Sequence, residues 1–137
     1  MNPPRQRTQS CGRREAAGRL RDAQAQLDFA GFATATSSAA ERKAAASSAV
    51  LAGVAASDAA CCAALGERSR SADHRDAVAL VREVEPGGAE AAKQLRRLLD
   101  LKDASQYGFE DIGGQRLLTA VRNAEALVAF AERIVRR

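Results

Sequence analysis

Five residues of this chain have polar side chains that suit phosphate binding or proton transfer: Asp58, His74, Lys102, Asp103 and Tyr107. A lysine binds phosphate as a point charge, and a histidine gains and loses a proton near neutral pH because its unperturbed pKa is about 6.5. We take Lys102, Tyr107 and His74 as candidate catalytic groups, and all five as candidate binding residues. The sequence contains no complete catalytic motif, whether P-loop, HExxH or Ser–His–Asp.

Asp58 interrupts the apolar stripe of the longest predicted helix, between Leu51 and Leu65. A buried carboxylate needs a partner or stays protonated. Lys102 occupies the corresponding inner position of a later predicted helix, so we predict that Asp58 and Lys102 pair across the two helices. We expect the histidine and the tyrosine nearby. Two interpretations stay open: such a pair either fixes the register of the helices or belongs to a pocket for a ligand or nucleic acid.

The elements that must position these residues are helices. Alanine is the commonest residue and the best helix former, Trp is absent, and only 3 Pro are present. Apolar spacing, a capping box at Ser38 and Glu41, and glycine or proline stops divide the chain into five helical segments. We expect these segments at about Arg13 to Gly31, Ser38 to Gly66, Ser71 or Asp73 to Pro86, Ala89 to Tyr107, and Gly114 onward. The predicted fold is all-α: an antiparallel four-helix-type bundle with one short additional helix at 12–137, after a disordered basic arm at 1–11.

The positive charge of the chain is concentrated at its start. The formal net charge is +4, but residues 1–21 hold six Arg and one Glu, which leaves the rest with 15 basic and 16 acidic residues. Such a start either contacts the phosphates of RNA or DNA or is a solvated tail. The arginines are Arg5, Arg7, Arg13, Arg14, Arg19 and Arg21.

The three cysteines are Cys11, Cys61 and Cys62. Adjacent positions on a helix point in different directions, so Cys61 and Cys62 cannot readily bridge each other. We interpret all three as small buried hydrophobes of a cytoplasmic protein, and expect no metal or cofactor. The sequence has no run of about 18 apolar residues and its start lacks the apolar segment of a secretory signal, so we expect no membrane association.

Four runs of sequence carry a family resemblance: AASDAACC (55–62), DHRDAV (73–78), LLDLKDASQYG (98–108) and AVRNAEAL (120–127). With these runs, the stretch from Ser48 to Ile134 resembles the HEPN-domain superfamily, in particular an actinobacterial branch. The resemblance implies an α-helical bundle that forms a homodimer, with a site at or near the dimer interface.

In active ribonucleases of that superfamily, an arginine and a following polar residue precede a histidine by a few positions. There they handle RNA phosphate and the proton transfers of metal-independent cleavage. By this resemblance, Lys102 stands in place of the arginine, Asp103 in place of the polar residue and Tyr107 in place of the histidine. Lysine lacks the planar fork of arginine, and tyrosine has a pKa near 10.

We therefore expect a dimeric HEPN-like module that binds nucleic acid, a nucleotide or a partner protein, without robust catalysis. One alternative is a metal-independent ribonuclease of a toxin–antitoxin or phage-defence system, for which a nucleotidyltransferase would be the partner protein. The other is a plain protein-interaction module whose core charges are structural.

Overall fold

The computed structural model describes residues 7–34, 36–106, 108 and 110–137. The described part of the chain is mostly helical, as predicted. The elements are α1 (Arg13–Ala30), α2 (Ala39–Leu65), α3 (His74–Arg82), α4 (Gly88–Gln106) and α5 (Gly114–Val135), with two short strands, β1 (Thr8–Ser10) and β2 (Glu67–Ser69).

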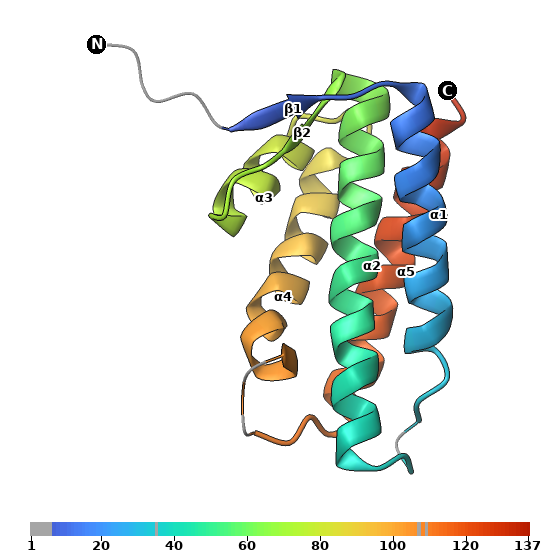
Figure 1. Ribbon diagram of the computed structural model, residues 1–137, viewed down its shortest axis with the longest axis vertical. Coiled ribbons are helices and arrows are strands. Elements are labelled where there is room, and N and C mark those ends of the chain that lie inside the picture. Colours follow the sequence, from blue (N-terminus) through green and yellow to red (C-terminus); the bar gives the residue numbers. More distant parts are fainter. Residues whose placement is uncertain (1–6, 35, 107, 109) are drawn as a thin grey trace.

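The four long helices α1, α2, α4 and α5 lie side by side, and α2 contacts each of the other three (Figure 1). The four long helices alternate in direction along the chain, and the short α3 lies beside α4 (Figure 1). The apolar core therefore lies around α2.

Local sequence accounts for the length of α2. The Ser38 hydroxyl accepts a hydrogen bond from the Glu41 amide at 3.1 Å, and the Glu41 carboxylate accepts one from the Ser38 amide at 2.8 Å. This capping box satisfies two amides at the start of the helix. At the other end Gly66 adopts φ +73°, a left-handed conformation that stops the helix.

Small side chains let the helices approach closely. Ala16, Ala23 and Ala30 of α1, spaced seven residues apart, are fully buried. In α2, a Cβ at Gly53 would lie 2.4 Å from Leu98 Cδ1, so glycine is needed where α4 crosses.

The predicted stripe of α2 was not its most buried face. Leu51 is 44% exposed and Asp58 is half-buried, whereas the alanines of this helix from Ala45 to Ala60 are buried. The reason is that α1, α4 and α5 surround the alanine-rich sides of α2. The stripe through Leu51 and Asp58 instead faces a cavity.

By length and composition α2 could cross a membrane, contrary to the expectation that no segment is apolar enough. However, 67% of its most apolar 18-residue window is buried inside the protein. The core helix of a soluble protein has this property.

Two expectations about the start of the chain were wrong for the described residues. Thr8–Ser10 are ordered as β1, which pairs antiparallel with β2 so that Gln9 lies opposite Arg68. Cys11 forms a disulfide with Cys62 and is not a free hydrophobe. Spacing gave no sign of this pairing, because it joins residues 51 positions apart. Residues 1–6 of the predicted arm lie outside the described residues.

Candidate functional site

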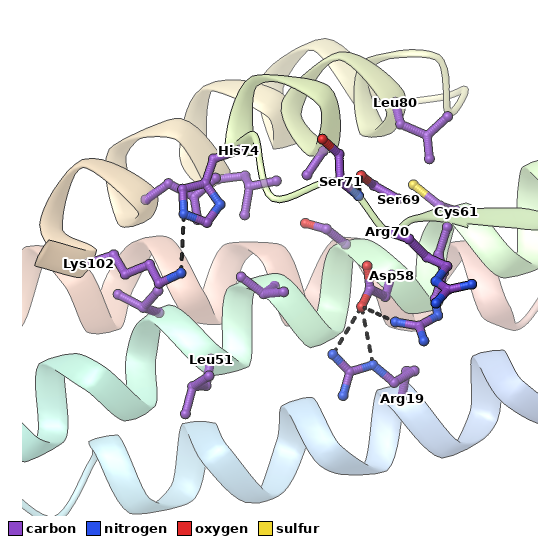
Figure 2. A pocket seen from close by; sticks show the side chains of 17 residues that line it. Arg19, Leu51, Asp58, Cys61, Ser69, Arg70, Ser71, His74, Leu80 and Lys102 are labelled. Atoms are coloured by element: carbon purple, nitrogen blue, oxygen red, sulfur yellow. Dashed lines mark hydrogen bonds and ion pairs between the residues drawn. The ribbon is translucent and has the colours of Figure 1, made fainter. Parts of the chain in front are cut away.

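A cavity of about 320 Å³ opens between α2, α3, α4 and the segment that contains β2 (Figure 2). We call it the basic cavity, because five of its lining residues have basic side chains: Arg19, Arg68, Arg70, His74 and Lys102. Aliphatic side chains from α2, α3 and α4, among them Val54, Leu80, Leu95 and Leu99, make its floor.

Asp58 contributes the one carboxylate among the described residues that line this cavity. The Arg19 guanidinium donates to its Oδ2 from Nε at 3.3 Å and from Nη2 at 3.0 Å. Arg68 Nη1 lies 3.6 Å from the same oxygen. Burial raises the pKa of Asp58 above its ordinary value, while the charges of Arg19 and then Arg68 oppose that rise.

The predicted ion pair between Asp58 and Lys102 is wrong. Arg19 from α1 and Arg68 from β2 flank the carboxylate, Arg19 through two hydrogen bonds and Arg68 as an ion pair. Lys102 lies toward the opposite side of the cavity, beside His74 (Figure 2). The two helices place Asp58 and Lys102 in one cavity, but with different partners.

Lys102 and His74 are in contact, with 3.2 Å between Nζ and Nε2. An ammonium group has donors and no acceptor, so in a hydrogen bond between the two groups Nε2 of His74 is the acceptor. His74 is the first residue of α3, and the Asp73 side chain caps that helix by accepting from the Arg75 amide at 3.0 Å. The cap therefore fixes the backbone from which His74 reaches the cavity.

The remaining two predicted residues are not part of this arrangement. Asp103 is exposed and does not line the basic cavity. Tyr107 lies outside the described residues. The structure thus brings together three of the five predicted site residues: Asp58, His74 and Lys102.

Sequence reasoning missed Ser57, whose side chain lines the cavity and is 4% exposed. Within the described part of the chain, its hydroxyl oxygen has no hydrogen-bond partner. A buried hydroxyl without a partner carries a desolvation penalty of about 1–3 kcal/mol. A polar ligand in the cavity would remove that penalty.

Sequence reasoning also missed the four residues Arg68, Ser69, Arg70 and Ser71, all of which line the cavity. Arg68, Ser69 and Arg70 fall between two predicted helices, and Ser71 is a possible start of the second. The alternation of arginine and serine was the available signal, because alternate side chains of an extended segment share a face. Among the described residues, no hydrogen bond or ion pair engages the Arg70 guanidinium.

The cavity combines positive charge with weak nucleophiles. Four permanently cationic side chains face one carboxylate, so a negatively charged ligand is favoured. The Cys61 thiol also lines the cavity, but burial, and next the charge of Asp58, raise its pKa to about 12. It therefore stays a protonated thiol at neutral pH. The described residues contain no cluster of His, Cys, Asp or Glu able to hold a metal ion.

A scan of protein-family models finds none that matches this chain, and a search of curated proteins finds no similar sequence.

Proposed function

We propose that the protein binds a phosphate-bearing nucleotide in the basic cavity, either a free nucleotide or the terminal nucleotide of a nucleic-acid strand, and does not cleave it efficiently. One observation carries this proposal: a cavity rich in cationic side chains also contains the unpaired, buried hydroxyl of Ser57. Arginine, lysine and hydroxyl groups are the donors that phosphate oxygens accept from.

The shape of the cavity supports a small ligand. Its volume of about 320 Å³ is at the lower end of the range for small-molecule sites. The aliphatic floor suits the base or ribose, while the cationic side chains at the rim suit the phosphate. None of the described lining residues is Phe, Tyr or Trp, so base stacking is limited to the His74 imidazole and phosphate contacts supply most of the affinity.

The proposal includes a four-helix bundle of the HEPN type, on the strength of the four long helices and the resemblance of residues 48–134. In that resemblance Lys102 and Tyr107 replace the two groups that cleave RNA. Inefficient cleavage follows, since lysine does not clamp a phosphate in two places and tyrosine exchanges protons poorly near pH 7.

The ribonuclease alternative has one observation in its favour. Lys102 Nζ lies 3.2 Å from His74 Nε2 in the basic cavity, so an imidazole and an amino group stand side by side where phosphate would bind. In that case His74 replaces the missing histidine, and the protein is a ribonuclease of a toxin–antitoxin or phage-defence pair with a nucleotidyltransferase as its partner.

The proposal also includes a homodimer. Phe29 and Phe32 are 67% and 79% exposed, and Leu51 is 44% exposed. Phe29 and Leu51 line a groove between α1 and α2 that also contains Arg19 and Asp22. A two-fold contact brings the same surface of two copies together, and the apolar groups and opposite charges of this groove supply groups that pair in such a contact.

Light scattering tests the dimer. At micromolar concentration the expected mass is about twice the chain mass of 14.5 kDa. Phe29→Ser should give a monomer, whereas Leu118→Ser, which changes an exposed apolar residue of α5, should leave the dimer intact. A monomeric wild type, or a dimer that survives Phe29→Ser, contradicts this part of the proposal.

A binding assay tests the site itself. We expect adenosine 5′-monophosphate and a labelled, 5′-phosphorylated pentanucleotide to bind, and Arg70→Gln and Lys102→Gln each to weaken binding about tenfold, as loss of a charged hydrogen bond of about 1.4 kcal/mol predicts. Arg133→Gln on α5 is the matched control, because it removes the same charge from an exposed position outside the cavity. Equal losses for Arg70→Gln and Arg133→Gln would contradict the site.

We place the protein in the cytoplasm, where nucleotides and RNA are abundant. Thiol reductants in that compartment act on accessible disulfides. The Cys11–Cys62 bond would therefore be intact or reduced there according to the redox state of the cell.

A further inference from the structure

The Cys11–Cys62 disulfide lies next to the basic cavity. Cys62 is in the last turn of α2, one helical turn after Asp58, and Cys61 between them lines the cavity. Cys11 follows β1 directly and is half-buried, whereas Cys62 is buried. The disulfide thus joins the described start of the chain to α2 beside the site, and Cys11 is the more exposed of its two residues.

The segment that the disulfide holds pairs with a wall of the cavity. The Cys11 amide donates to the Gly66 carbonyl at 3.0 Å, and the Arg70 amide donates to the Arg7 carbonyl at 2.8 Å. Gln9 Oε1 also accepts from Arg68 Nη2 at 3.0 Å. Residues 7–11 therefore contact β2 from one end to the other.

This pairing is weak without the disulfide. Each strand has three residues, and within the described residues β1 is the sole strand paired with β2. A two-stranded sheet is at best marginally stable by itself in water. The covalent bond to α2 keeps β1 close to β2 and so supplies the stability that the short two-stranded ladder lacks.

The same wall carries charges that the ligand needs. Arg68 and Arg70 project from β2 and the residue after it into the basic cavity, with Ser69 and Ser71 between and beyond them. Arg68 is also held against Asp58, at 3.6 Å. If β1 separates from β2, the backbone of this wall loses the hydrogen bonds between the two strands, and both arginines lose their fixed positions.

We propose that the Cys11–Cys62 disulfide is a redox switch for the basic cavity: the oxidised protein binds its phosphate-bearing ligand tightly, and reduction loosens the β1–β2 wall and weakens binding. This inference rests on the function proposed above, since it regulates that same site. The reductant is a dithiol. A thiolate of the dithiol attacks the Cys11 sulfur, and the S–S bond to Cys62 breaks. The second thiol of the reductant then releases Cys11. The protein thereby gains two electrons and two protons and has two thiols, while the dithiol becomes a disulfide.

Cys61 takes no part in this exchange. A disulfide is attacked by a thiolate, and the Cys61 thiol is kept protonated by burial, which raises its pKa to about 12. It is also adjacent to Cys62 on the helix, where the two side chains diverge. Cys61 therefore provides the matched control for any cysteine substitution at this site.

The test compares the full-length protein with and without dithiothreitol. Thiol titration in denaturant should find one thiol before reduction and three after it. Amide hydrogen exchange at Cys11 and Arg70 should accelerate at least about tenfold on reduction, because opening is then about 1.4 kcal/mol easier, while the amides of α5 stay unchanged. The dissociation constant for the 5′-phosphorylated pentanucleotide should rise about tenfold.

Variants check the assignment. Cys11→Ser should behave as the reduced protein in both assays and should no longer respond to dithiothreitol. Cys61→Ala should show the same relative change on reduction as the wild type, whatever its own affinity, because it leaves the Cys11–Cys62 disulfide in place. Three thiols in the untreated protein, or a Cys11→Ser variant that binds as tightly as the oxidised wild type, would overturn the switch.

The two readouts separate this inference from the proposed function. Faster exchange at Cys11 and Arg70 with an unchanged dissociation constant overturns the switch and leaves the binding site standing. No binding of the pentanucleotide in either redox state overturns the proposed function and the switch with it. Slow amide exchange at Cys11 and Arg70 in both the oxidised and the reduced protein shows that the wall does not depend on the disulfide. This result overturns the switch whether or not the pentanucleotide binds.

Discussion

The Arg19 guanidinium reaches across from α1 and donates two hydrogen bonds to Asp58 Oδ2 on α2, at 3.3 Å from Nε and 3.0 Å from Nη2. Arg68 approaches the same oxygen from β2 at 3.6 Å. Three elements thus meet at one carboxylate at the edge of the basic cavity. The cluster links α1, α2 and β2, and the carboxylate offsets part of the positive charge of the cavity.

Arg19→Gln should lower the free energy of unfolding by about 1–3 kcal/mol, because it leaves a largely buried carboxylate with weaker partners. Arg21→Gln is the control. It removes the same charge from the same helix, where the side chain is exposed and has no partner among the described residues. Urea unfolding at pH 7 measures both. Equal effects of the two substitutions would show that the Arg19–Asp58 contact contributes no stability.

The pH dependence of stability should reveal Asp58. Burial raises the pKa of this carboxyl in the folded protein above its value in the unfolded chain. The folded state therefore binds the proton more tightly, so the contribution of Asp58 to stability is largest at low pH and is lost as the pH rises through its folded pKa. Compared with Asp58→Asn, the wild type should gain stability between pH 7 and pH 4 in parallel urea titrations. A difference that shrinks or stays constant toward pH 4 would contradict this direction.

Two glycines inside helices should respond in opposite ways to alanine. Gly53→Ala should destabilise by about 1–3 kcal/mol through overpacking, because its Cβ would lie 2.4 Å from Leu98 Cδ1 and 3.2 Å from Leu127 Cδ1. Gly18→Ala should stabilise by about 0.5–1 kcal/mol, since the nearest atom to its Cβ is Arg21 Nη2 at 3.9 Å. Thermal unfolding reports both. A stabilising Gly53→Ala would mean that α2 and α4 are farther apart than the structure places them.

The elements of the fold were predictable where the signal is local. The Ser38–Glu41 capping box begins α2 and the left-handed Gly66 ends it. Both signals can be recognised in the sequence. The pairing of residues 7–11 with β2 was not predictable from the sequence. It depends on a disulfide between Cys11 and Cys62 and on a partner strand far along the chain.

The site was predictable only in part, for a related reason. Asp58, His74 and Lys102 were identified as polar residues at inner or terminal helix positions, and they do line one cavity. Their partners were not identified, since Arg19 and Arg68 lie on other elements and no spacing rule relates them to Asp58. Ser57 is a small residue among alanines, and its missing hydrogen bond is visible only in three dimensions.

The salt dependence of binding should show which arginines contact phosphate. Each lost contact on a single strand should reduce the slope of log affinity against log salt by about 0.7, so Arg70→Gln and Lys102→Gln should each give that change. The Arg-rich start offers a competing surface, because Arg13, Arg14 and Arg21 are exposed on α1. Replacing all three by Gln should leave the slope unchanged if the basic cavity is the site. A loss of about 2 in the slope would instead assign binding to the start of the chain.

RNA cleavage by the purified protein should be much slower than for active HEPN ribonucleases. Efficient cleavage needs a group that takes and gives a proton near pH 7, and a tyrosine at 107 has a pKa near 10, about three units too high, or about 4 kcal/mol at 1.36 kcal/mol per unit. His74 is the group that would have to substitute, but its Nε2 lies 3.2 Å from Lys102 Nζ, so the lysine must move before that nitrogen exchanges a proton with RNA. The assay compares the wild type with His74→Ala and Tyr107→Phe on one labelled RNA. Rapid cleavage that His74→Ala abolishes and Tyr107→Phe leaves intact would establish the ribonuclease, with His74 as its proton-transfer group. Rapid cleavage lost in Tyr107→Phe would assign that role to the tyrosine.

The complementary double variant, Lys102→Arg with Tyr107→His, restores the residues of the active pattern. A gain of cleavage in this variant would show that the substituted side chains, and not the scaffold, account for the low activity of the wild type.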